Sequence, residues 1–202
     1  MADLFNQKAD EWDGNELVRA LSSAIGASIL THVPLHDGME VMDFGAGTGL
    51  ISAHVAPRVR KIIAVDISEA MLGKLVAKPQ LQGKVEACCQ DITDIPLDVR
   101  FDLIISAMAM HHVEDTHKLM RAFRDHLKPG AMVALADLDK EPGDFHAPGT
   151  EGIFHFGFER ADLQGTLEAQ GFQDVRFVTA HTVGKEDRRY PVFLVTARRG
   201  ER

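Results

Sequence analysis

Residues 41–49 read VMDFGAGTG, an apolar run with one acidic residue, followed by glycine at every second position. The apolar run is typical of a buried strand, and the three glycines indicate a turn whose backbone can approach another group closely. Such a turn serves either the packing of a helix on a strand or the binding of a ligand through backbone N–H groups. The turn alone leaves both interpretations open.

Apolar runs rich in β-branched residues alternate with amphipathic stretches around this turn, which predicts a parallel sheet with helices on both faces. Two consecutive strand-like runs near the C-terminus, joined by GKEDRRYP, predict a hairpin and an antiparallel edge strand. We therefore predict an α/β fold, a Rossmann-like three-layer sandwich with a mostly parallel seven-stranded sheet and an antiparallel C-terminal edge hairpin. The predicted strands are 40–44, 61–66, 84–89, 101–106, 131–137, 175–183 and 192–198, and the predicted helices are 16–32, 50–56, 69–78, 116–126 and 160–170.

Length and charge limit the classes of protein that fit. The chain has 202 residues, which suits one domain, and its formal net charge of -8 disfavours a nucleic-acid partner. No apolar run approaches the ~20 residues that cross a bilayer, so no membrane partner is expected. The N-terminus has neither a basic start nor an apolar h-region, which predicts a cytoplasmic protein. Cys88 and Cys89 are adjacent in a predicted strand, and we interpret them as small core residues.

Glycine spacing and acidic residues distinguish between ligands. The dinucleotide fingerprint G-x-G-x-x-G needs glycine where this chain has Leu50, and no Gly-Lys-Ser/Thr of a P-loop is present. Asp66 ends the second predicted strand, about 20 residues past the glycines, where a carboxylate can accept the hydroxyl protons of a ribose. Asp91 follows the third strand, in position to meet an adenine edge. These residues predict a nucleoside ligand.

The chain at this point resembles the class I S-adenosylmethionine-dependent methyltransferases, in particular their small-molecule branch of methyltransferase-domain 11, 12 and 25 types. VMDFGAGTG is similar to the first motif of that family, AVDISEAML to the second, QDITDIP to the third, and FDLIISAMAMHHVED with LKPG to the fourth motif and the turn before the fifth strand. The resemblance implies S-adenosylmethionine as cofactor and S-adenosylhomocysteine as product. It implies that the methionine part of the cofactor is held by Asp43, Gly45, Ala46, Gly47 and Gly49. It implies that the ribose and adenosine contact Asp66, Ile67 and Met71, and that the adenine is read by Asp91 and the backbone at Ile92. Ser106 and Ala107 would lie beside the methyl group.

The charges agree with this resemblance. S-adenosylmethionine is a sulfonium cation, so its site should offer carboxylates rather than a phosphate cradle, and Asp43, Asp66 and Asp91 offer them. We divide the single predicted methyltransferase domain, residues 1–202, into an N-terminal lid and helix (1–35), a cofactor-binding half (36–140) and an acceptor-side half (141–202).

Three histidines are candidate catalytic residues. Methyl transfer requires a positioned nucleophile and sometimes removal of a proton, and imidazole titrates near neutral pH. His111 and His112 follow the fourth predicted strand, although either could instead cap or pack against the next helix. His155, in IFHFGF, could line an acceptor pocket or lie exposed between two core aromatic residues. Phe5 and Trp12 resemble the lid of related enzymes, the alternative being a frayed terminus anchored by tryptophan.

The acceptor remains open at this level. The NPPY-type motif of amine-directed nucleic-acid and protein-glutamine enzymes is replaced by SAMA, and only the fifth predicted strand ends in carboxylates, Asp137 and Asp139, so no metal is expected. We predict methyl transfer to a small-molecule acceptor by a monomer or homodimer. The alternatives are a non-catalytic S-adenosylmethionine-binding module that acts through a partner and an NAD-dependent oxidoreductase.

Overall fold

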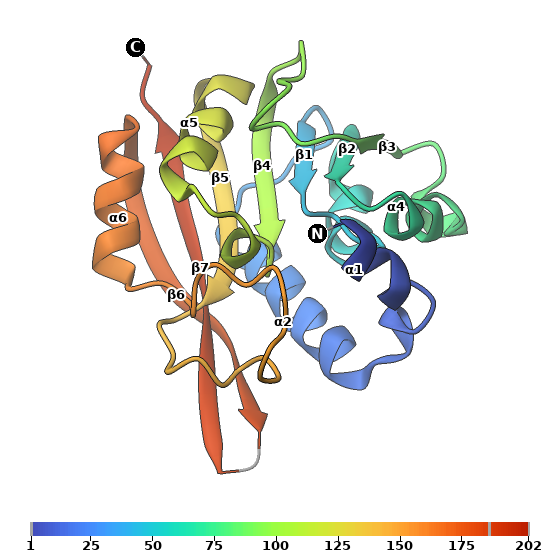
Figure 1. The fold of residues 1–202 in the computed structure, drawn as a ribbon. Helices are drawn as coiled ribbons and strands as arrows, with labels where there is room; N and C mark the ends of the chain where they lie inside the picture. Colours follow the sequence, from blue (N-terminus) through green and yellow to red (C-terminus); the bar gives the residue numbers. More distant parts are fainter. Residues whose placement is uncertain (1, 186, 202) are drawn as a thin grey trace.

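The alternating apolar and amphipathic stretches form one sheet with helices on both faces (Figure 1). The computed structural model describes residues 2–185 and 187–201. The strands are β1 (Glu40–Phe44), β2 (Lys61–Asp66), β3 (Val85–Cys89), β4 (Phe101–Ala107), β5 (Leu127–Leu138), β6 (Phe172–Lys185) and β7 (Arg188–Arg199). The α-helices are α1 (Ala2–Lys8), α2 (Glu16–His32), α3 (Leu50–Val55), α4 (Glu69–Val76), α5 (Thr116–His126) and α6 (Arg160–Ala169), and the short 3-10 helices are η1 (Trp12–Gly14), η2 (Ala56–Arg58), η3 (Pro79–Leu81) and η4 (Met110–His112).

The strand order is β3-β2-β1-β4-β5-β7-β6. Strands β1 to β5 are parallel, and β7 is antiparallel to both of its neighbours, β5 and β6. The predicted fold class is therefore confirmed. The antiparallel strand β7 lies one place inside the edge, and β6 forms the edge itself.

Two apolar layers hold the helices on the sheet. On one face, α2, α3 and α4 pack against the sheet, and α2 contributes Leu21, Ile25 and Ile29 at four-residue spacing, as expected of an amphipathic helix. On the other face, α5 packs through Leu119 and Phe123, and α6 packs through Leu163 and Leu167. Within the described part of the chain, no helix is long and apolar enough to cross a membrane.

The C-terminal hairpin is longer than the sequence predicts. Most of GKEDRRYP belongs to the two strands, and Lys185 pairs directly with Arg188. The ribbon extends because Val183 and Tyr190 are buried on one side of it, where the Tyr190 ring packs edge-on against Phe145 with 5.3 Å between ring centroids. The polar residues between Val183 and Tyr190 hide this apolar pattern in the sequence, which is why the prediction ended the strands too early.

The two cysteines lie on β3, which is an edge strand. Cys88 is half-buried and Cys89 is exposed, so the interpretation of both as core residues was wrong for Cys89. An edge strand covers fewer of its side chains than a central one.

The topology places the carboxyl ends of β1, β2, β4 and β5 at one edge of the sheet. The strand order reverses between β1 and β4, which is where open α/β sheets bind ligands. Helix α1 and the segment between β5 and α6 lie at this edge, near the lower ends of the strands in Figure 1. The fold therefore brings the N-terminal helix and the segment after β5 to the carboxyl ends of the parallel strands.

Candidate active site

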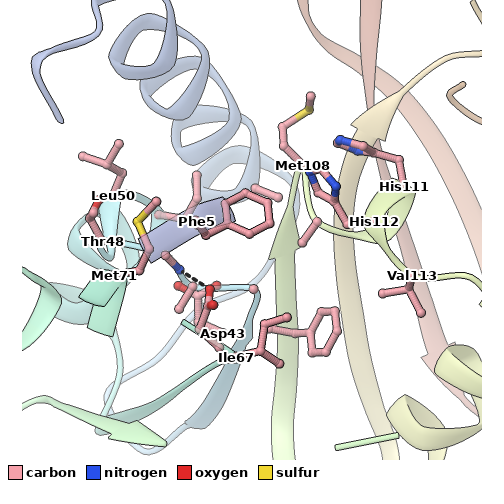
Figure 2. A pocket seen from close by; sticks show the side chains of 18 of the residues that line it. Phe5, Asp43, Thr48, Leu50, Ile67, Met71, Met108, His111, His112 and Val113 are labelled. Atoms are coloured by element: carbon pink, nitrogen blue, oxygen red, sulfur yellow. Dashed lines mark hydrogen bonds between the residues drawn. The ribbon is translucent and has the colours of Figure 1, made fainter. Parts of the chain in front are cut away.

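A cavity of about 720 Å³ opens at this edge of the sheet (Figure 2). Turns after β1, β2 and β4, helix α1, and the segments around Phe145 and Lys185 line it. We call the part lined by the ends of β1, β2 and β3 the cofactor end, and the part lined by His111, His112 and His146 the histidine end. Of the predicted cofactor-binding residues, those that line the cavity are Asp43, Gly45, Ala46, Gly47, Asp66, Ile67, Met71, Asp91 and Ala107.

The three glycines of the first turn have three different roles, although all have positive φ. A Cβ on Gly45 would lie 2.3 Å from the Cβ of Ala109, so this glycine lets the turn after β1 touch the segment after β4. A Cβ on Gly49 would lie 2.8 Å from Leu75, so Gly49 permits helix packing and does not line the cavity. A Cβ on Gly47 would meet open space. Of the three, only Gly47 lines the cavity with open space where a side chain would stand.

Asp43 is buried at the end of β1 and lines the cofactor end. Its Oδ2 accepts a hydrogen bond of 2.6 Å from the Ser52 hydroxyl on α3. Burial raises the pKa of Asp43 to about 7, and the Ser52 bond opposes this rise. A cationic ligand beside Asp43 would favour its ionised form.

Asp66 ends β2 and uses both carboxylate oxygens for backbone groups. Oδ2 accepts from the Gly47 N–H at 2.8 Å, and Oδ1 accepts from the Ser68 N–H at 2.9 Å. Burial raises its pKa. Each oxygen keeps a lone pair for a further donor, such as a ribose hydroxyl.

Two further predicted cofactor contacts, Ile92 and Ser106, do not line the cavity. Both are buried, and the Ile92 side chain packs in the core beside α5. Successive side chains of a strand point to opposite faces, so Ala107 can line the cavity where Ser106 cannot. The predicted role of the Ile92 backbone stays a prediction.

His111 is locked to Asp137 at the histidine end. The Nδ1–H of His111 donates to Asp137 Oδ1 at 2.7 Å, and its backbone N–H donates to Oδ2 at 3.2 Å. Both side chains are almost fully buried. The Nε2 of His111 is also buried and has no hydrogen-bond partner in the structure. With the proton held on Nδ1, Nε2 presents a lone pair.

His112 lies against the lid. Its Nδ1–H donates to the carbonyl of Gly152 at 2.7 Å, and its ring meets Phe5 edge-on with 5.0 Å between centroids. Burial, with the neighbouring His111, lowers the pKa of His112 to about 4. His112 is therefore a neutral imidazole at neutral pH.

The third predicted histidine, His155, does not line the cavity. Its Nε2–H donates to the carbonyls of Val113 and Glu114, which ties this segment to the turn after η4. Its neighbours Phe154 and Phe156 are 45% and 48% exposed, so they are not core residues either. Both interpretations of His155 were wrong because alternation here reflects an irregular segment, not a strand.

Sequence reasoning missed His146, which takes the place predicted for His155. His146 lines the cavity, and its ring centroid lies 5.1 Å from that of His111. It also missed the His111–Asp137 pair, although it noted Asp137 as a strand-end carboxylate. Within the described residues, no three His, Cys, Asp or Glu side chains are arranged to hold a metal ion.

The N-terminal segment covers the cofactor end. Asn6 Oδ1 accepts from the Ser68 hydroxyl at 2.7 Å, and Asp13 Oδ1 accepts from the Thr48 hydroxyl at 2.6 Å. Phe5 points into the cavity between the two ends (Figure 2). These contacts support the predicted lid rather than a frayed terminus.

Comparisons with known proteins agree with this geometry. Residues 41–130 match the family model described as a methyltransferase domain. This match, with the relatives below, indicates a methyltransferase domain of the class I S-adenosylmethionine-dependent type over residues 41–130. The match to a methyltransferase domain disfavours the oxidoreductase alternative. The carboxylates and the open space beside Gly47 fit S-adenosylmethionine, the cofactor of such enzymes.

Among the relatives of this chain is an uncharacterized methyltransferase of Schizosaccharomyces pombe, 32% identical over 54% of this chain and 42% of that protein. The cypemycin N-terminal methyltransferase of a Streptomyces species is 34% identical over 61% of this chain and 50% of that protein. The chain thus spans half or less of these curated relatives. The structure of a DhpI complex with S-adenosylhomocysteine shares the fold, with a TM-score of 0.78 and 21% identity over 100% of this chain and 96% of that one.

Proposed function

We propose that this protein transfers a methyl group from S-adenosylmethionine to a small-molecule acceptor bound at the histidine end, and releases S-adenosylhomocysteine. One observation carries the proposal: a single cavity joins strand-end carboxylates to the unpartnered, buried Nε2 of His111. The donor and the acceptor of one group would meet in such a cavity.

The cofactor end offers groups of the right chemistry. Asp66 can accept ribose hydroxyl protons, Asp43 can balance the positive charge, and Ile67 and Met71 offer apolar contact for the adenosine. S-adenosylmethionine, when bound, supplies an electrophilic methyl group on a positively charged sulfur. Gly47 leaves room for backbone contact with this ligand.

The histidine end offers a general base. Methylation of a hydroxyl, thiol or amine releases one proton, and His111 Nε2 can accept it. Asp137 fixes the His111 tautomer and balances the charge of the imidazolium that forms. Because both groups are buried, water competes little for this proton.

The size of the cavity supports a small acceptor. Its volume of about 720 Å³ lies within the roughly 300–1,000 Å³ that is usual for small-molecule sites, and it must also hold the cofactor. A non-catalytic binding module would be expected to have a blocked acceptor side, but here the cavity continues past Ala107 to His111. Cytoplasmic location, a monomer or homodimer, and the absence of nucleic-acid partners stay predictions, tested by cell fractionation and light scattering.

Calorimetry and a labelling assay test this proposal. The protein should bind S-adenosylhomocysteine, and Asp66→Ala should weaken that binding by about tenfold or more through lost hydrogen bonds. Methyl-labelled S-adenosylmethionine incubated with a metabolite extract should label a small molecule, and His111→Ala should abolish labelling with cofactor affinity unchanged. Failure to bind S-adenosylhomocysteine, or full labelling by both variants, would contradict the proposal.

A further inference from the structure

Two polar groups at the histidine end have no role in the chemistry described above. The Nε2 of His146 is buried and has no hydrogen-bond partner among the residues that the structure describes. The ammonium of Lys185 lines the same cavity and, among the described residues, makes one hydrogen bond, to the carbonyl of Phe145. An ammonium has three donors, so two remain for another molecule.

The segment that carries His146 is firmly held. Glu141 Oε2 accepts three backbone N–H groups, from Gly143 at 2.7 Å, Asp144 at 2.9 Å and Phe145 at 3.2 Å. This turn delivers His146 to a position 5.1 Å from His111, measured between ring centroids. His146 is thereby presented to the cavity before any ligand arrives.

Lys185, the last residue of β6, lies beside the segment that carries His146. Its Nζ lies 3.9 Å from the centre of the Phe145 ring, which Tyr190 supports from the hairpin. The Lys185 charge is close enough to His146 to contribute to the lowered pKa of that imidazole. The two free donors of Lys185 and the His146 Nε2 therefore serve one region of the cavity.

The charges at this end favour an anion. Lys185 and Lys8 both line it, and Lys8 is near enough to His112 to influence its pKa. Asp137 is already satisfied by His111 and by the Leu138 N–H.

Three further carboxylates bear on this charge balance. Glu141 is near enough to His146 to act on its pKa, but its side chain does not line the cavity and its Oε2 is occupied by three backbone N–H groups. Glu114 and Asp115 line the cavity just before α5, and Asp115 Oδ1 accepts the Lys118 N–H as the cap of that helix. Lys185 and the imidazole N–H groups thus supply donors around His146, where no lining residue with a carboxylate is its immediate neighbour in the described chain.

We propose that His146 and Lys185 form a subsite for an oxyanion, so that the acceptor is a small molecule bearing a carboxylate or phosphate group. His146 donates its N–H and Lys185 its free ammonium donors to the oxyanion, while His111 faces the atom that is methylated. Naming the bound molecule as the acceptor rests on the proposed function; the presence of the subsite does not.

Binding of simple probes to the complex with S-adenosylhomocysteine tests the subsite. Benzoate and phenyl phosphate should bind, and benzamide, which has the same ring without the charge, should bind at least tenfold more weakly. Lys185→Gln and His146→Gln should each weaken oxyanion binding roughly tenfold or more, which is the effect of one charge-assisted hydrogen bond. The exposed Lys140, outside the cavity, provides the matched control Lys140→Gln, which should leave binding unchanged.

A second readout is independent of affinity. The His146 pKa, followed by histidine-selective NMR, should rise when benzoate or phenyl phosphate is added, because an adjacent anion favours the imidazolium. Equal binding of benzamide, unchanged binding by Lys185→Gln, or no binding of either oxyanion would each overturn the subsite. A protein that binds these oxyanions but labels no metabolite would retain the subsite and lose the proposed function.

Discussion

The two ends of the cavity differ in how the chain builds them. The cofactor end is assembled from consecutive strand ends, with Asp43 near the end of β1, Asp66 at the end of β2 and Asp91 just after β3. The histidine end joins η4 to the segment after β5 and to the C-terminal hairpin, so that His111 meets Asp137 and His146. One end carries acidic groups on a local motif, and the other carries imidazoles and lysines on distant segments. The groups suited to the methyl donor and those suited to the acceptor therefore come from different parts of the chain.

The largest expected effect separates the two ends by function. Asp137→Asn should lower kcat by about 10²- to 10⁴-fold, because the His111 tautomer and its imidazolium lose their partner. The affinity for S-adenosylhomocysteine should stay within twofold, since Asp137 does not line the cofactor end. Steady-state kinetics and calorimetry measure both quantities.

Asp139→Asn is the matched control for this variant. Asp139 lies two residues further on and pairs with Arg160 at 2.7 Å, outside the cavity. Its loss should change stability rather than kcat. Equal losses of kcat in the two variants would show that Asp137 acts only by supporting the fold.

Gly45→Ala should be the next largest effect, because Gly45 is where the two ends touch. The added Cβ would meet Ala109 at 2.3 Å in a residue with φ of 67°. We expect a loss of about 3 kcal/mol in the free energy of unfolding, measured with urea. Gly47→Ala, with open space around its Cβ, should cost only about 1 kcal/mol while still weakening cofactor binding. Equal stability losses would refute the distinction between the two glycines.

The pH dependence of stability should have opposite signs at the two ends. Unfolded histidine binds a proton near pH 6.5 and folded His112 only near pH 4, so His112 costs stability as the pH falls from 6.5 to 4. The loss should reach about 2 kcal/mol, less than the full shift gives, because part of the ring meets solvent. Asp43, with a folded pKa of about 7 against 3.8 unfolded, adds stability as the pH falls from 7 to 4.

Melting temperatures of two variants between pH 7.5 and pH 4 separate these contributions. His112→Asn, whose amide can still donate to Gly152, should lose less stability on acidification than the parent protein. Asp43→Asn should lose more. Parallel pH curves for the parent and both variants would rule out this account of the two ends.

The smallest effect concerns the lid that spans the two ends. Asp13 joins Thr48 at 2.6 Å and Lys78 at 2.6 Å, so Asp13→Ala should release this contact at a cost of about 1 kcal/mol. Dissociation of S-adenosylhomocysteine, followed by stopped flow, should accelerate several-fold. Glu11→Ala, an exposed neighbour without an ion pair among the described residues, should leave the rate unchanged.

The fold and the cofactor end followed from sequence because their signals are local. A strand and the turn after it occupy neighbouring positions, so apolar runs, Gly47 and Asp66 could be placed without knowing the tertiary structure. The errors at this end concern orientation. A shift of one position in a strand reverses the face, which separates Ala107 in the cavity from Ser106 outside it.

The histidine end could be predicted only in part. His111 and His112 follow a strand, but no spacing rule connects them to His146 or Lys185. Only the folded chain shows that the turn built on Glu141 carries His146 inward, whereas His155 is turned away to bond the carbonyl of Val113. Histidine content alone did not distinguish these two.

Sequence separation also bears on the order in which the site forms and opens. The bond from His112 to Gly152 spans 40 residues, and that from Tyr190 to Asp144 spans 46. Closing such long loops costs entropy that must be recovered by contacts made late in folding. We expect the histidine end to assemble after the cofactor end and to open before it in local unfolding, so that amide exchange around Gly152 is fast while the strand ends that carry Asp43 and Asp66 stay protected.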